Sequence, residues 1–473
     1  MRYLSVILFI ISMLPLKAQE QPVPIPVVNG VSWELATYRK NSISNINYDL
    51  ELRIPALTEE PIRADQVFSF NLNNVSDHLQ IDFKEDGAKI ERIIVNGITR
   101  PINHYNEHIV IDKNHVKVGK NEIELSYIAG DGALNRNDNY LYTLFVPDRM
   151  RTSFPSFDQP NLKATFDLTL IMPKVWKAIS SAPIKNRSDR EFRSTVEFER
   201  SNVMSTYLFS FVAGGFEEIV RDVEGVEMTM LHREPEAAKV AQNVDEIFRL
   251  HKASLDYMAE YTGIDYPFKK FGFALIPSFQ FGGMEHVGAI QYKARTLMLD
   301  SDPPKTDLLA RAALIGHETS HMWFGDLVTM DWFNDVWTKE VFANFMSAKL
   351  VNPSFPEINH DLRSHLRLHP GAYAVDRSEG PNPIRQELPN LNEAGSMYGA
   401  IIYNKAPIMM RQLEKMLGED NFRDGIREYL KTYAFSNATW PNLIEILDKR
   451  SEQDLKAWSE VWVNTPGRPT FKV

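Results

Sequence analysis

Two histidines and a glutamate form the part of this chain that is best equipped for chemistry. The sequence there reads His317-Glu318-Thr319-Ser320-His321. Residues four apart in a helix lie one above the other on a single face, so His317 and His321 would present two imidazoles together. Such a pair can share one tetrahedral zinc ion, and Glu318 beside it can reach a water on the metal. The pattern also occurs in helices that carry an ordinary pair of surface histidines, so its surroundings must decide.

The residues before the first histidine predict the helix that this geometry requires. Residues 308–315 are mostly strong helix formers, and Thr306 or Asp307 is available as the N-cap. We therefore expect a helix that starts at one of these two residues and runs through the histidine pair.

A third ligand is expected downstream, at Glu340. Eighteen residues separate His321 from Glu340, which is enough for a turn at Gly325 and a second helix that returns a carboxylate. Two histidines and one glutamate, with a fourth position left open, are a known ligand set of catalytic zinc. The alternative is a solvated helix carboxylate, but the aromatic and aliphatic neighbours of Glu340 favour burial.

The segment 317–345 resembles the zinc site of the aminopeptidase N family of metallopeptidases, which also contains leukotriene hydrolase. Three other blocks resemble that family in the same order: residues 154–166, Phe281-Gly282-Gly283-Met284-Glu285-His286 and Tyr403-Asn404-Lys405-Ala406. The resemblance covers most of the chain. It implies one zinc ion per chain, bound by His317, His321 and Glu340.

The resemblance also implies roles for two residues near the metal. Glu318 would act as general base and acid, taking a proton from water and passing it to the leaving amine. Tyr403 would donate a hydrogen bond to the developing oxyanion. Taken without the resemblance, Tyr403 reads as a core tyrosine beside Ile401 and Ile402.

Glu285 would separate an aminopeptidase from an endopeptidase. A free ammonium needs a fixed carboxylate near the metal, and Gly282-Gly283 would let the backbone run close to the peptide as an edge strand. Met284 and His286 complete this substrate-binding block. The alternative is a β-turn that exposes Glu285.

The chain departs from the family at several points. His286 stands where the family has asparagine, and the positions of a second amine-binding pair fall on Leu144 and Val146, which cannot bind an ammonium. We therefore expect weaker selectivity for a free N-terminus. The family's helical C-terminal domain has no counterpart here, so we expect an open cleft unless a partner or second subunit covers it.

Composition excludes several classes of protein. The 473 residues are 44% hydrophobic and 24% charged, as in a soluble globular protein of two or three domains. The net charge of −10 gives no excess of basic residues of the kind that nucleic-acid binding requires. Cysteine is absent, so neither disulfides nor thiolate ligands contribute.

The N-terminus is typical of an exported protein. Arg2 precedes an apolar run over residues 4–16 that is too short to span a bilayer, and we interpret residues 1–18 as a signal peptide. An uncleaved anchor is the alternative. Cleavage would leave a periplasmic or extracellular chain with no stretch long enough to cross a membrane.

Periodicity predicts an α+β protein of more than one domain. Residues 121–127 and 166–170 alternate polar and apolar, so residues 19–225 are expected to form a β-rich domain, either a sandwich or a saddle. Residues 236–261 have helical spacing, and residues 272–277 form a short apolar strand. With the resemblance, residues 226–473 are expected to form a thermolysin-like α/β zinc catalytic domain.

Three functions follow from these observations. The first is an exported zinc aminopeptidase that acts on peptides with a free N-terminus. The second is an endopeptidase with the same zinc chemistry and little requirement for a free amine. The third is a scaffold without catalysis, against which the intact His317, Glu318, His321, Glu340 and Tyr403 argue.

Overall fold

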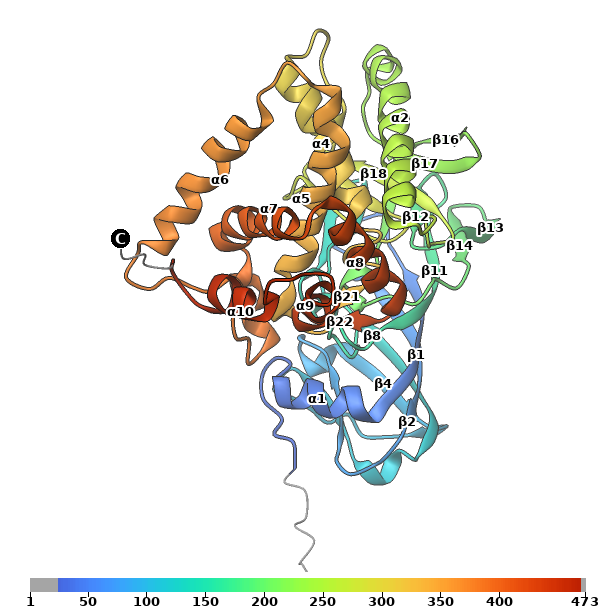
Figure 1. Ribbon diagram of the computed structural model, residues 1–473. Helices are drawn as coiled ribbons and strands as arrows, with labels where there is room; N and C mark the ends of the chain where they lie inside the picture. The colour runs from blue at the N-terminus through green and yellow to red at the C-terminus, as the bar shows by residue number, and fades with distance from the viewer. Residues whose placement is uncertain (1–23, 469–473) are drawn as a thin grey trace, which may run out of the picture.

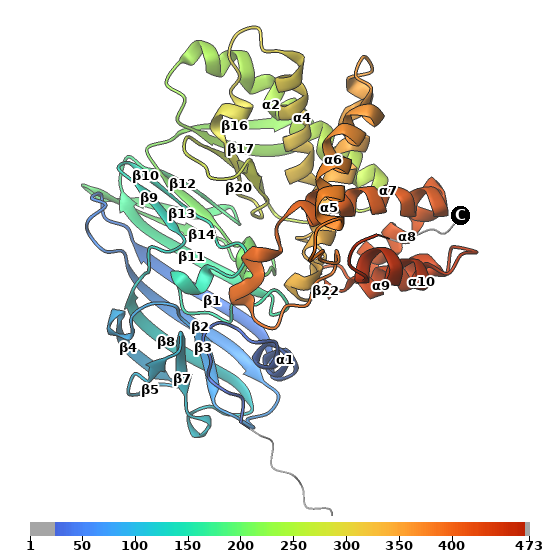
Figure 2. The ribbon, with the colours of Figure 1, turned by 90° about the vertical axis from the view of Figure 1, so that its left-hand side faces the viewer.

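The computed structural model describes residues 24–468, and the predicted signal peptide lies outside these residues. A β-rich N-terminal half is followed by a half in which helices cover a mixed sheet (Figures 1 and 2). The predicted α+β class with a β-rich domain first is confirmed. Within residues 24–468, no helix combines the length and the apolar character that crossing a membrane requires.

An eight-stranded sheet forms the base of the N-terminal half. Its strands, in spatial order, are β13 (Ile184–Asp189), β14 (Arg193–Phe198), β11 (Ala164–Pro173), β1 (Ile43–Arg53), β2 (Arg63–Leu72), β8 (Gly119–Ile128), β4 (Ile90–Val95) and β5 (Ile98–Thr99). All neighbours are antiparallel except β1 and β11. Side chains along β8 and β11 alternate between buried and less buried positions, as predicted.

Two smaller sheets and a helix complete this half. Their elements are β12 (Lys177–Ser180), β15 (Phe211–Gly214), β10 (Tyr140–Thr143) and β9 (Leu134–Asn137) in one sheet, β3 (Leu79–Asp82), β7 (His108–Ile111) and β6 (His104–Tyr105) in the other, and the helix α1 (Trp33–Ser42). Aromatic rings join the parts: Phe166 of β11 stacks on Phe209 with ring centres 4.2 Å apart. The interior of the N-terminal half is therefore built largely from the inward-facing residues of its sheets.

A five-stranded mixed sheet supports the C-terminal half. Its order is β16 (Glu217–Val223), β17 (Val226–His232), β18 (Phe271–Ile276), β20 (Ile290–Lys293) and β19 (Gly283–Met284). β17, β18 and β20 are parallel, whereas β16 and β19 are antiparallel edges. Every residue of β18 is buried, as expected for a central strand covered on both faces. The division expected between residues 225 and 226 falls in the turn of the β16–β17 hairpin.

Helices pack on this sheet and around it (Figure 2). They are α2 (Ala237–Thr262), α3 (Ala294–Leu297), α4 (Lys305–Ser320), α5 (Trp337–Val351), α6 (His360–Asp376), α7 (Ala406–Leu417), α8 (Glu419–Thr432), α9 (Trp440–Asp448) and α10 (Leu455–Ser459). The short strands β21 (Thr329–Met330) and β22 (Asn437–Ala438) pair in parallel. α2 ends at Gly263, whose φ of 66° is left-handed, which explains the glycine there.

The start of α4 differs from the prediction. Its N-cap is Pro304, which forms no side-chain capping bond, so neither Thr306 nor Asp307 caps it. The proline ring fixes φ of Pro304 near the helical value while its ψ of 151° stays extended, so the helix begins directly after it without a side-chain cap. α4 then packs between α2 and α5.

A buried histidine ties α2 to the sheet beneath α4. The Nδ1–H of His251 donates to the carbonyl of Ile247 at 2.8 Å, and Nε2 lies 3.1 Å from the Tyr292 hydroxyl on β20. Its ring stacks on Phe273 of β18, with centres 4.2 Å apart. Burial lowers the pKa of His251 to about 4, so the ring stays neutral in the folded protein.

The stability of the protein should therefore fall below neutral pH. Between pH 6.5 and 4 the unfolded chain binds a proton at His251 that the folded chain does not, so stability is complete above this window and is lost within it. The pKa difference corresponds to about 3 kcal/mol. Urea unfolding of wild type and His251→Gln at pH 7 and pH 5 measures the effect. The variant should lose less stability on acidification than the wild type, and equal losses would contradict the assignment.

Candidate metal centre

The two histidines meet at the end of α4. His317 lies in its last turn and His321 caps it, so the predicted helical spacing of four is present. Their Nε2 atoms lie 3.1 Å apart, and the rings cross at 87°. Two nitrogen ligands of a tetrahedral zinc are separated by about 3.3 Å, so this separation suits a shared ion.

Glu340 reaches the same point from the first turn of α5. Its Oε2 lies 3.7 Å from Nε2 of His317 and 4.0 Å from Nε2 of His321. One donor atom from each of the three residues falls within 4.8 Å of the others. The structure therefore brings together the three side chains predicted as ligands, and two imidazoles with a carboxylate form a donor set that zinc accepts.

The imidazoles of His317 and His321 both direct Nε2 at the cluster. The Nδ1–H of His321 donates to the carbonyl of Phe324 at 3.0 Å, which fixes the orientation of this ring. Burial and the neighbouring His321 lower the pKa of His317 to about 4, so His317 is neutral near pH 7. Neutral imidazole is the form that binds a metal.

Glu318 is buried beside this cluster, and its Oε2 has no hydrogen-bond partner. Burial, together with the charges of Glu285 and Glu340, raises its pKa well above the usual range. An unpartnered buried carboxyl is unfavourable unless it serves a ligand or a reaction. Glu318 therefore has the environment of a group that holds and releases a proton.

Gly283 on the edge strand β19 passes directly over Glu318. A Cβ atom at residue 283 would lie 2.2 Å from Oε1 of Glu318, whereas one at Gly282 would meet nothing nearer than 3.4 Å. The predicted edge strand is thus present, and it comes so close to the carboxyl that any side chain at residue 283 would force Glu318 to move.

This close approach predicts a difference between two alanine substitutions. Gly283→Ala should destabilise the protein by about 1–3 kcal/mol, because the buried Glu318 must move. Gly282→Ala, its matched control one residue away, should leave stability nearly unchanged. Denaturant unfolding of both variants measures the effect. Equal stabilities would show that the contact is easily relieved.

Glu285 is buried near the cluster, but it already has a partner. The Nζ of Lys339 contacts its Oε1 and also lies 3.1 Å from Oε1 of Glu340. Burial raises the pKa of Glu285, but His321 and Lys339 outweigh burial and hold it well below the usual range. The alternative of a β-turn that exposes Glu285 does not fit, since its side chain is 4% exposed.

The other residues of the substrate-binding block are also buried. Met284 is 4% exposed and His286 is fully buried. The Nδ1 of His286 lies 3.2 Å from the carbonyl of Leu208, and its Nε2 has no partner. Leu144 and Val146, at the positions expected for a second amine-binding pair, are buried apolar side chains.

Tyr403 lies in a π-helical turn, Ile401–Lys405, that leads into α7. Tyr403 is 39% exposed as a residue, so the core-tyrosine alternative does not describe it. Burial and the charge of Glu340 raise its pKa, which keeps the hydroxyl protonated and able to donate. Its ring stacks near that of Tyr398, with centres 6.5 Å apart.

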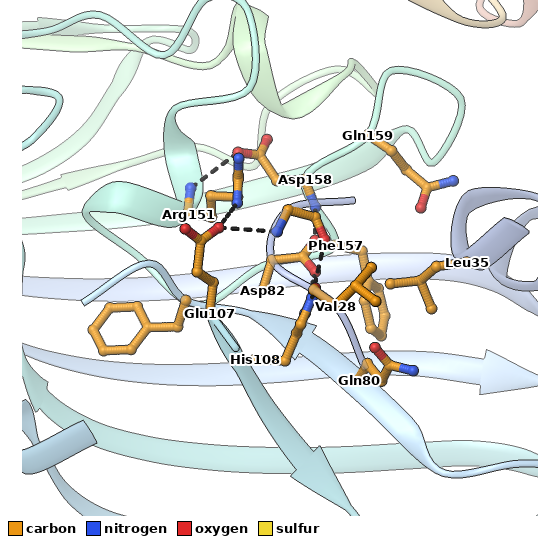
Figure 3. A network of polar contacts seen from close by, with 12 residues as sticks. Val28, Leu35, Gln80, Asp82, Glu107, His108, Arg151, Phe157, Asp158 and Gln159 are labelled. Atoms are coloured by element: carbon orange, nitrogen blue, oxygen red, sulfur yellow. Dashed lines mark hydrogen bonds and ion pairs between the residues drawn. The ribbon is translucent and has the colours of Figure 1, made fainter. Parts of the chain in front are cut away.

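Figure 3 shows a network of polar contacts within the N-terminal half. Its Arg151 also reaches the segment that precedes these tyrosines. In the network, Asp82 pairs with Nδ1 of His108 at 2.9 Å, and Arg151 contacts Glu107 at 2.6 Å. Arg151 also donates to the side chain of Asn392 at 2.7 Å. Asn392 belongs to the 3-10 segment Leu391–Met397, which runs directly into Tyr398. The N-terminal half therefore anchors the chain that carries the tyrosines.

Sequence reasoning missed two residues of this site, Lys339 and Tyr398. Lys339 is 3% exposed, and the hydroxyl of Tyr398 is buried without a partner. The signal for Lys339 was its place beside Glu340 in a segment rich in aromatic and aliphatic residues, where an unpaired ammonium would be costly. No local pattern in the sequence points to Tyr398.

Comparison with known proteins identifies related chains. Residues 247–462 match the peptidase family M1 domain, and residues 44–208 match the peptidase M1 N-terminal domain. The chain is 33% identical to an aminopeptidase N of Streptomyces lividans, over 69% of this chain and 38% of the relative.

Two further relatives have aminopeptidase names. A leucyl aminopeptidase of Saccharolobus solfataricus is 29% identical over 86% of this chain and 53% of its own length. A glutamyl aminopeptidase of Sus scrofa is 31% identical over 69% of this chain and 35% of its own length. The chain thus spans between about a third and about half of the length of these relatives.

Proposed function

The chain belongs to peptidase family M1, and on that basis we propose that it is a zinc aminopeptidase that removes N-terminal residues from peptides. The observation that carries the proposal is the convergence of His317, His321 and Glu340 on one point beside the buried Glu318. Zinc bound there would supply a Lewis acid that polarises the scissile carbonyl.

The residues around this point divide the remaining work. Glu318, whose Oε2 has no hydrogen-bond partner, takes the proton of the attacking water and returns it to the leaving amine. Tyr403, a partly exposed residue with a protonated hydroxyl, donates to the oxyanion as it forms. β19 lies at the edge of its sheet, where an extended peptide can pair with it.

The role of Glu318 predicts a variant that keeps the metal and loses turnover. Glu318→Gln should reduce kcat/KM on leucine p-nitroanilide by about a thousandfold, because the amide cannot transfer the proton. Its zinc content, measured by mass spectrometry of the metal, should stay at one ion per chain. Glu260→Gln, an exposed change on α2, is the control for activity. An active Glu318→Gln variant would disprove the role, and a wild type that binds no zinc and hydrolyses nothing would support the non-catalytic scaffold.

We also propose that the chain is exported, on the basis of the apolar run over residues 4–16 behind Arg2. Expression of the full chain in a bacterial host should give mature protein in the periplasmic fraction. Intact-mass measurement should find that it begins at Gln19. A membrane-bound product with residue 1 still present would favour the uncleaved anchor.

A further inference from the structure

The predicted amine-binding carboxylate is occupied by an ammonium from the chain itself. Lys339 Nζ contacts Oε1 of Glu285, and the two side chains are 3% and 4% exposed. The same Nζ lies 3.1 Å from Oε1 of Glu340 and 5.4 Å from the ring centre of Tyr207. Two carboxylates and an aromatic face thus surround one positive charge.

The side chain of Lys339 is held in place by packing. A Cβ atom at Gly325 would lie 3.4 Å from both Cβ and Cδ of Lys339, so the lysine stem packs against this turn. Its head cannot exchange its partners for water without leaving the interior. The ammonium is therefore a fixed part of the site.

A substrate α-ammonium is the same chemical group as the head of Lys339. To reach Glu285 it must either share the carboxylate or displace the lysine. Sharing places two positive charges on one buried carboxylate, and displacement leaves Lys339 with Glu340 alone.

We propose that Lys339 is a specificity-determining residue that fills the ammonium position on Glu285, so that N-acylated substrates are cleaved nearly as well as substrates with a free α-ammonium. The inference rests on the proposed hydrolysis at this site and defines its substrate class. Substrate selection would then depend on the side chain and on backbone pairing with β19, while the charge of the N-terminus contributes little.

The test compares leucine p-nitroanilide with its N-acetyl twin. For the wild type, the two kcat/KM values should differ by no more than about tenfold, or ~1.4 kcal/mol. Lys339→Gln frees Glu285, so the ratio of free to acetylated substrate should rise by about tenfold or more. Lys349→Gln is the matched control, because Lys349 lies on the same helix and pairs with Glu414 instead. Its ratio should equal that of the wild type.

Two outcomes would overturn the proposal. One is a wild type that prefers the free amine by about a thousandfold, or ~4 kcal/mol. The other is an unchanged ratio in Lys339→Gln. The ratio is measured within one preparation, so partial loss of folded enzyme does not affect it.

A second variant tests the idea if Lys339→Gln does not fold. Glu285→Gln should lower kcat/KM for both substrates by the same factor. Loss confined to the free-amine substrate would show that Glu285 binds the substrate ammonium, and it would overturn the proposal.

A binding measurement separates this proposal from the proposed activity. Leucine hydroxamate and N-acetyl-leucine hydroxamate are titrated into zinc-loaded protein by calorimetry. If nothing is hydrolysed, the proposed function fails, yet the two affinities still report on Lys339. Similar affinities support the occupied carboxylate, and much tighter binding of the free amine overturns it.

Discussion

The meeting of α4 and α5 at one buried point is the constraint on which the rest of the structure depends. Three carboxylates and one ammonium, from Glu285, Glu318, Glu340 and Lys339, lie there with little or no exposure. Charges in such a place are tolerated only when each is paired, neutralised or given a ligand. The surrounding fold must therefore keep these side chains in fixed positions and prevent them from turning towards solvent.

The two halves of the chain share this task. In the C-terminal half, His251 joins α2, which packs against the helix that carries His317, to Tyr292 on β20. In the N-terminal half, Arg151 donates a hydrogen bond to Asn392, 241 residues further along, and so holds in place the segment that leads to Tyr398. A β-rich domain that contributes no predicted metal ligand thus helps to position one wall of the site.

Contacts between residues close together in the sequence could be predicted, whereas contacts between distant residues could not. His317 and His321 meet because of helix periodicity, which is a local property of the sequence. Glu340 joins them because the chain returns after a short separation in the sequence. The contact of Lys339 with Glu285 spans 54 residues and two separate elements, so no local pattern reveals it. The start of α4 was misplaced because Pro304 acts through its backbone, whereas capping signals are read from side chains. The π-helical turn at Tyr403 likewise has no simple sequence signature.

The same residue type performs different roles here because the charges around each carboxyl differ. Glu285 and Glu340 both contact the ammonium of Lys339, and their pKa values lie below the usual range although burial alone would raise them. Glu318 has no such partner, and burial with two neighbouring carboxylates raises its pKa instead. Carboxyls whose environments separate their pKa values in this way divide naturally into fixed anions and a proton carrier. Lys339 therefore has two effects on the site. It keeps Glu285 and Glu340 charged, and it occupies Glu285 so that this carboxylate no longer binds a substrate ammonium.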